Sequence, residues 1–98
     1  MLATIMGTGN SFEDELVAKF HGLFIGIDRY ADMRISWLNG AVRDASALHA
    51  LFVDTLEGES HCLLTDEKAT LSGIRDGLES IATTAGMNDI VVVFYAGH

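Results

Sequence analysis

The sequence is poor in several residue types, and each shortage excludes a class of protein. Its 98 residues include no proline, a single cysteine, and 6 Lys and Arg against 14 Asp and Glu, for a net charge of −8. One cysteine cannot form an intrachain disulfide, so a disulfide-stapled secreted fold is excluded. The acidic balance argues against binding to nucleic acid or anionic membranes and favours basic peptides as partners.

The chain also has no apolar run of membrane-spanning length and no secretory signal of the usual basic and then apolar form. We therefore expect a cytoplasmic protein made of one domain or part of one.

The strongest structural signal lies at residues 90–95, which are six consecutive large apolar residues, four of them β-branched. Such a run predicts a central strand of a parallel sheet that is covered on both faces. The run is followed by Ala96, Gly97 and His98. Because reactive groups of open α/β sheets gather at the carboxyl ends of the strands, His98 is a candidate functional residue.

Two further apolar runs, at residues 22–27 and 61–65, predict two more strands. Helical spacing of apolar residues predicts one helix from Leu38 to Phe52, with Asn39 available as its cap, and another that is capped by Thr70 and ends before Gly86. The buried face of the later helix is predicted to hold Leu71, Ile74, Leu78 and Ile81, and its glycines Gly73 and Gly77 indicate close packing.

This alternation predicts an α/β fold, a three-layer sandwich with helices on both faces of a mainly parallel sheet. Asp28, Asp66 and His98 would then share one rim of the sheet. Residues 1–19 are expected to form an N-terminal extension with a short helix that begins after Ser11, and residues 20–98 the domain itself.

Three segments carry a resemblance to a known family: residues 24–30 (FIGIDRY), 38–45 (LNGAVRDA) and 91–98 (VVVFYAGH). In this order they resemble the N-terminal half of a caspase-like domain, with bacterial caspase homologues and metacaspases as the nearest likeness. The resemblance covers roughly residues 20–98. It implies a cysteine endopeptidase without cofactor or metal, acting on a peptide or protein substrate.

The resemblance implies that His98 is the catalytic imidazole, which suits a side chain whose ordinary pKa is about 6.5. In the family the nucleophilic cysteine follows the next strand, so it would lie in a missing C-terminal half or on a second chain. Cys62 lies inside an apolar run and is expected to be a small core residue. The remaining histidines, His21, His49 and His61, lack metal-ligand spacing and are expected to be structural or surface residues.

The resemblance also concerns Asp44, which matches the metacaspase acid that lines the pocket for a basic P1 side chain. It implies a preference for Arg or Lys. Caspases instead carry an arginine where this chain has Leu38, so a preference for Asp is not implied. The alternative role for Asp44 is to complement the positive end of its own helix.

Two other functions stay open from the sequence. Residues 2–6 could be a strand, 7–12 a phosphate loop and Asp28 a ribose-binding acid, as in a dinucleotide-binding unit, although Phe12 is bulky for the third glycine position. The second open function is that of a caspase-like module that has lost catalysis and works by binding partners.

The strand that ends at His98 is expected to have one unpaired edge, because the family's next strand is not in the sequence. An apolar open edge favours aggregation, a dimer formed through that edge, or a second polypeptide that covers it.

Overall fold

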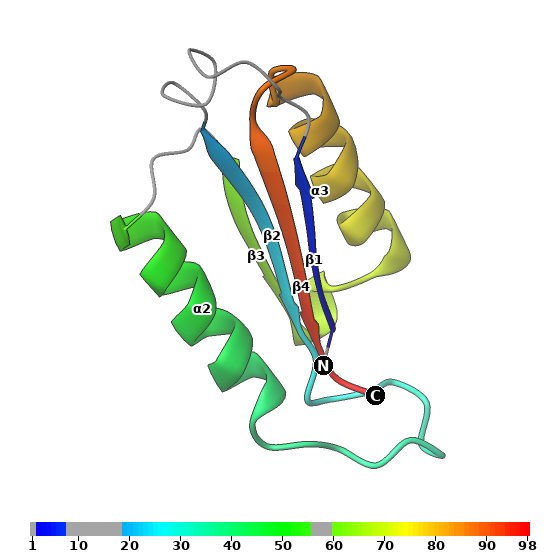
Figure 1. Ribbon diagram of the computed structural model, residues 1–98. Coiled ribbons are helices and arrows are strands. Elements are labelled where there is room, and N and C mark those ends of the chain that lie inside the picture. Colours follow the sequence, from blue (N-terminus) through cyan, green and yellow to red (C-terminus); the bar gives the residue numbers. More distant parts are fainter. Residues whose placement is uncertain (1, 8–18, 56–59) are drawn as a thin grey trace.

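The computed structural model describes residues 2–7, 19–55 and 60–98 and contains a four-stranded sheet with one helix on each face (Figure 1). This arrangement confirms the predicted α/β sandwich. The elements are, in chain order, β1 (Leu2–Gly7), β2 (Phe20–Gly26), α2 (Ala41–Thr55), β3 (Ser60–Thr65), the short 3₁₀ helix η1 (Asp66–Lys68), α3 (Leu71–Thr84) and β4 (Ile90–Ala96). The helix predicted after Ser11 lies outside the described residues.

The sheet has the strand order β1-β4-β2-β3, and β2 is parallel to both β3 and β4. The three parallel strands are those that the apolar runs predicted. β4 pairs with β2 in a register that sets Phe24 opposite Phe94 and Gly26 opposite Ala96. All three strands therefore end at the same rim of the sheet, and the segments that follow them start there.

The second edge of β4 is paired with β1, which runs antiparallel to it from Leu2 opposite Tyr95 to Gly7 opposite Ile90. The expectation that this edge is unpaired is therefore wrong. Sequence reasoning treated the amino-terminal residues as an extension, whereas part of them supplies a strand of the sheet. Among the described strands, β1 and β3 are the outermost.

The position of β1 also contradicts the dinucleotide-binding interpretation. That unit requires the first strand to lie parallel in the sheet, with its phosphate loop at the same rim as the ribose-binding acid. Here β1 is antiparallel to β4, so Gly7 lies beside Ile90 at the rim where the parallel strands begin. Asp28 follows β2 and lies at the opposite rim, where those strands end.

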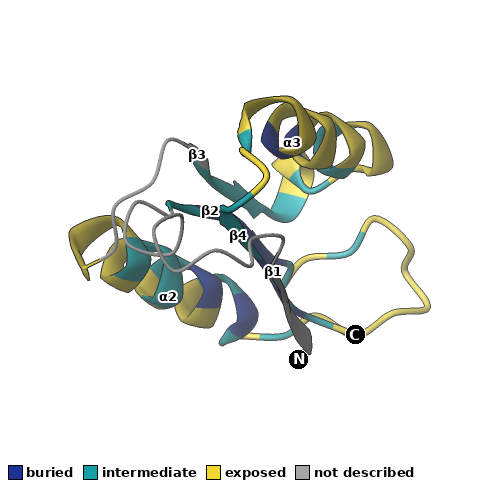
Figure 2. Ribbon diagram, turned by 45° about the horizontal axis from the view of Figure 1, so that its top comes forward, coloured by how far each residue is buried: buried dark blue, intermediate teal, exposed yellow. Residues whose placement is uncertain are grey.

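One core layer lies between the sheet and α2 and is built around Phe24, Phe94 and two alanines of the helix, Ala41 and Ala45. The second layer lies on the α3 side and contains Leu23, Ile25 and Ile81. Alternate residues of a strand face opposite sides of a sheet, so each strand contributes to both layers. Figure 2 shows that both helices turn their buried residues toward the sheet.

The predicted buried face of α3 is only partly right. Ile81 is buried and Ile74 packs on the same layer, but Leu71 and Leu78 are 73% and 43% exposed. Gly77 takes the place of a larger residue, because a Cβ there would lie 3.0 Å from Leu23 Cδ1. The close packing predicted at Gly77 is therefore confirmed. Thr70 caps the helix, as predicted, with its side chain accepting a hydrogen bond from the Gly73 amide at 2.9 Å.

A buried polar contact joins the starts of β2 and β4. The fully buried His21 donates from Nε2 to Asp89 Oδ2 at 2.8 Å. Asp89 also accepts hydrogen bonds from the amides of Gly86, at 2.8 Å, and Lys19, at 3.1 Å. Three hydrogen bonds lower the pKa of Asp89 to about 2, namely those from the Gly86 amide, from His21 and from the Lys19 amide, in decreasing order of effect.

Neither helix within residues 19–55 and 60–98 has the length and apolar character to cross a membrane.

Gly26 allows α2 to pack directly on β2, which yields a first prediction. A Cβ at Gly26 would lie 2.6 Å from the carbonyl oxygen of Ala41 and 2.8 Å from the Cβ of Ala45. Because the nearest obstacle is backbone, we expect Gly26→Ala to lower the free energy of unfolding by about 1–3 kcal/mol in urea denaturation. The matched control is Gly40→Ala, whose Cβ would meet only Arg43 Nη2 at 3.4 Å. Equal stability of the two variants would contradict this account of the packing.

The acceptor role of Asp89 predicts how stability depends on pH. A carboxyl whose pKa is lowered from 3.8 to about 2 on folding stabilises the protein above pH 4 and loses this contribution as the pH falls toward 2. We expect Asp89→Asn to flatten the decrease in stability between pH 4 and pH 2, as measured by urea unfolding at a series of pH values. Asp76→Asn, an exposed acid on α3, should leave the wild-type slope intact. An unchanged slope in Asp89→Asn would count against the assignment.

Candidate active site

The carboxyl ends of β2, β3 and β4 place polar residues at one rim of the sheet. Asp66 follows β3 and accepts hydrogen bonds through Oδ1 from the amides of Asp28 and Arg29, at 2.9 and 3.0 Å. The Asp28 carboxylate accepts in turn from the first amides of α2, Ala41 at 2.8 Å and Val42 at 3.3 Å. Asp28, and not the predicted Asn39, therefore caps the N-terminus of α2 by accepting its free N–H groups.

Asp66 makes these contacts from an unusual backbone conformation. Its φ of 46° is the one positive value among the described non-glycine residues. Asp tolerates this left-handed region better than most side chains do. The turn directs the Asp66 carboxylate back over the end of β2, so that it holds the segment that leads to Tyr30.

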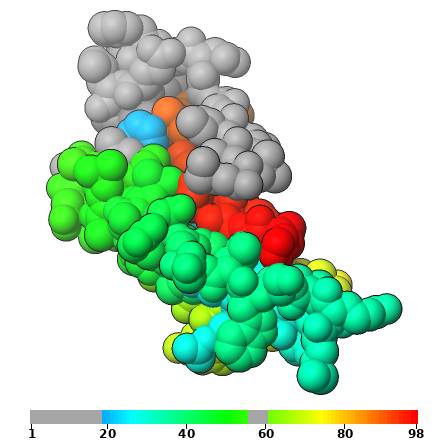
Figure 3. Space-filling model, turned by 90° about the horizontal axis from the view of Figure 1, so that it is seen from below, coloured from blue at the N-terminus to red at the C-terminus, as the bar shows by residue number. Residues whose placement is uncertain are grey.

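His98 follows β4 and is exposed. In Figure 3 the C-terminal end of the chain, in red, lies against the loop that leaves β2. Its amide donates to the Tyr30 hydroxyl at 2.7 Å, and its main-chain oxygen accepts from the Tyr95 hydroxyl at 2.8 Å. The imidazole lies 5.4 Å from the Tyr30 ring, measured between centroids. Nε2 of the imidazole lies 3.1 Å from the carbonyl oxygen of Ser36.

The contact with Ser36 assigns the protonation of the ring. A carbonyl oxygen can only accept, so Nε2 carries the hydrogen and donates it. In the neutral imidazole Nδ1 is then the nitrogen with the free lone pair. Nδ1 is therefore the nitrogen of His98 that is able to accept a proton.

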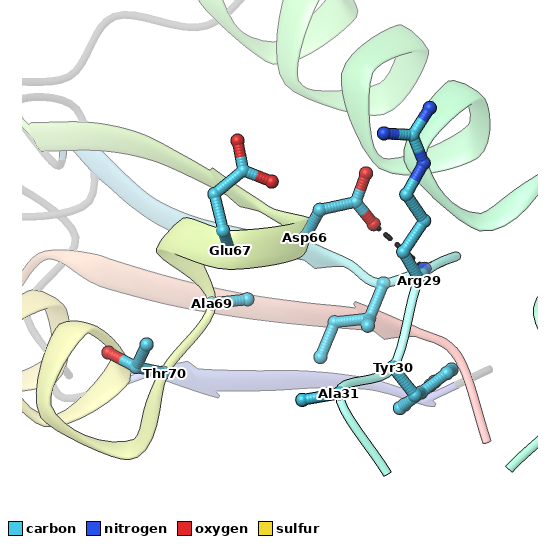
Figure 4. Close-up of a pocket in the computed structure, with 8 residues that line it drawn as sticks. Arg29, Tyr30, Ala31, Asp66, Glu67, Ala69 and Thr70 are labelled. Carbon is cyan, nitrogen blue, oxygen red and sulfur yellow. Dashed lines mark hydrogen bonds between the residues drawn. The ribbon is translucent and has the colours of Figure 1, made fainter. Parts of the chain in front are cut away.

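A hollow of about 510 Å³ lies next to this site, at the ends of β2 and β3 (Figure 4). Its lining is Ile27, Arg29, Tyr30, Ala31, Asp66, Glu67, Ala69 and Thr70. Tyr30 belongs both to this lining and to the contacts of His98. The hollow and the imidazole are thus neighbours that one aromatic ring separates.

Asp44 lies elsewhere, in the first turn of α2, with 56% of its side chain exposed. Its carboxylate is 4.0 Å from Arg43 Nε. It lines a second, shallow hollow of about 410 Å³ together with Ala47, Leu48, Leu51 and Phe94.

Cys62 does not reach His98. It lies on β3, which β2 separates from β4, and packs with the core layer on the α3 side. Burial raises the pKa of its thiol above the ordinary value, which favours the unreactive protonated form. The expectation that Cys62 is a core residue agrees with this position.

The other histidines are also distant from the rim. His21 bonds to Asp89 at the opposite end of β2, and the His49 ring packs 5.6 Å from Phe24 in the α2-side core. Burial lowers the pKa of His61, with smaller contributions from His49 and His21. Over residues 19–55 and 60–98 no three His, Cys, Asp or Glu side chains are grouped so that they could hold a metal ion.

Sequence reasoning missed three of the residues that contact His98. Tyr30 and Tyr95 lay inside the segments that carried the family resemblance, but 64 residues lie between them and nothing in their spacing indicates a contact. Ser36 contacts His98 through its carbonyl oxygen, which every residue type has. The residue type at this position therefore could not indicate the contact.

Comparison with known proteins gives one positive finding. The family model described as the caspase domain, of peptidase family C14, matches residues 19–98. No curated protein and no solved structure matches the chain. The matched region contains α2, α3, the three parallel strands and all the rim residues described above.

Proposed function

Because the chain belongs to the caspase-domain family of peptidases, we propose that the complete protein is a cysteine endopeptidase in which His98 is the general base. The observation that supports this most is the contact between His98 Nε2 and Ser36 O, which leaves Nδ1 as the basic nitrogen at the rim. Cys62 is the single cysteine of the 98 residues and is remote from the rim, so the nucleophile comes from another part of the protein or from a second chain.

In this mechanism Nδ1 of His98 takes the proton from the thiol, and the thiolate attacks the carbonyl carbon of the scissile peptide bond. The carbon–nitrogen bond then breaks, and Nδ1–H delivers its proton to the leaving amine. Water, deprotonated by Nδ1, attacks the thioester and releases the acid product and the thiol. Throughout, Ser36 O stabilises the imidazolium through Nε2–H. We propose a cytoplasmic location, where glutathione and thioredoxin keep thiols reduced.

We further propose that Asp44 selects a basic P1 residue. The hollow that it lines is otherwise apolar, with Leu48, Leu51 and Phe94 available to the aliphatic stem of Arg or Lys. The carboxylate would then pair with the charged end of that side chain, in place of its weak contact with Arg43. This places the charge in a setting that the bound peptide partly shields from water, where a pair is stronger than at an open surface.

The role of His98 is tested in the complete protein with fluorogenic peptides that end in Arg or Lys. We expect His98→Ala to lower kcat/KM by roughly 10²–10⁴-fold, the usual contribution of a general base. His49→Gln, a change on α2 remote from the rim, should retain nearly full activity. The proposal fails if His98→Ala hydrolyses the peptides at the wild-type rate, or if hydrolysis by the wild type resists thiol alkylation.

The role of Asp44 gives a separate prediction. We expect Asp44→Asn to raise KM for Arg and Lys substrates about tenfold, the effect of removing a hydrogen bond to a charged group. Peptides with an apolar P1 residue should be cleaved as before. Asp54→Asn removes the same charge from the last turn of the same helix and serves as the control. A uniform loss on all substrates would show that Asp44 only supports the helix.

A further inference from the structure

The backbone of His98 is held at both of its polar groups by tyrosines from different parts of the chain. Tyr30, in the loop after β2, accepts the His98 amide at 2.7 Å. Tyr95, on β4, donates to the His98 main-chain oxygen at 2.8 Å. Both hydroxyls lie close to Gly97, the residue between Tyr95 and His98 in the same segment.

The two contacts use different abilities of the phenol group. A tyrosine hydroxyl has one hydrogen to donate and can also accept. Tyr95 uses its hydrogen on the His98 oxygen, and Tyr30 uses a lone pair to accept the His98 amide. Two tyrosines from distant parts of the sequence therefore hold the backbone of one residue from both of its polar groups.

Gly97 provides the space that the two hydroxyls occupy. A Cβ at Gly97 would lie 2.6 Å from Tyr30 Oη and 2.7 Å from Tyr95 Oη, well inside van der Waals contact. Its φ is not positive, so the glycine is needed for the close approach and not for an unusual backbone conformation. Any side chain here would push at least one hydroxyl away.

The loop that carries Ser36 is also bonded to Tyr30. The indole Nε1 of Trp37 donates to the Tyr30 carbonyl at 3.2 Å, and the Tyr30 ring is tilted by 55° against the imidazole of His98. Burial, and then the nearby Tyr30, raise the pKa of Tyr95. The Tyr95 hydroxyl therefore keeps its hydrogen for His98 over the range in which an imidazole ordinarily titrates.

We propose that Tyr30 and Tyr95 are positioning residues, whose hydroxyls over Gly97 fix the backbone of His98 so that Nε2–H stays on the Ser36 carbonyl and Nδ1 is left to accept a proton. The catalytic meaning of this arrangement rests on the proposed function. The arrangement itself does not, because every bond in it lies within the described residues.

The test uses NMR on the 98-residue chain with ¹⁵N-labelled histidine, and its readout is the Nε2 proton of His98. A proton held on a carbonyl is retained against exchange, whereas that of a free surface imidazole is lost to water. We expect a resolved signal in the wild type, and exchange about tenfold faster in Tyr30→Phe and in Tyr95→Phe, the effect of losing about one hydrogen bond. Thr83→Ala removes a hydroxyl from α3 and should change nothing.

His21 supplies an internal control for folding, because its Nε2 proton is held by Asp89 at the far end of β2. The proposal is overturned if both Phe variants keep the His98 signal of the wild type. Should a Phe variant lose the His21 signal as well, Gly97→Ala decides, since it keeps both phenol rings and displaces only their hydroxyls. An unchanged His98 signal in Gly97→Ala would overturn the proposal, and selective loss would support it.

An activity measurement on the complete protein separates this proposal from the proposed function. We expect Tyr30→Phe to lower kcat about tenfold with KM unchanged, because a loosened base slows chemistry and not binding. A protein without peptidase activity would refute the proposed function, while the NMR result would still decide the role of the tyrosines. A rise in KM with kcat unchanged would place Tyr30 in substrate binding and overturn its positioning role.

Discussion

The backbone pairing of β2 with β4 is the constraint on which the rest of the rim depends. The two strands are parallel, and the ladder continues beyond them through the bond from the Ile27 amide to the Ala96 carbonyl at 3.0 Å. This extension brings the first residues after β2 against the first residues after β4. Tyr30 can therefore reach His98 although 67 residues lie between them in the chain. A shift of one residue in this register would turn both segments to the wrong face.

A second level of order comes from acids placed where strands end. Asp66 holds two amides of the β2 loop, and Asp28 in that loop holds two amides of α2. A carboxylate near a helix N-terminus satisfies free N–H groups and also complements the positive end of the helix dipole. These two side chains thus link the end of β3 to the start of α2 and fix the loop between β2 and α2 at both ends. The shape of the rim therefore depends on the loop between β2 and α2.

Local pattern predicted the parallel strands, both described helices, the Thr70 cap and the rim, because each depends on residues close in sequence. It failed where distant segments meet. The pairing of β1 with β4 was missed because its partners are more than 80 residues apart, and Asn39 was preferred to Asp28 as a helix cap because it lies nearer. Leu71 and Leu78 fit the helical period, but Gly77 lets α3 approach Leu23 closely. The side of the helix that contains Gly77 therefore packs on the sheet, and Leu71 and Leu78 stay exposed. The contacts of Tyr30 and Tyr95 with the His98 backbone have no local signal at all.

The direction of β1 has a practical consequence for anyone who handles this protein. Since Leu2 lies opposite Tyr95, the strand enters the sheet at the end where the catalytic candidate is found. An affinity tag fused ahead of Leu2 would emerge beside His98 and could crowd incoming peptides. A purification handle at this end is better removed by cleavage before any assay.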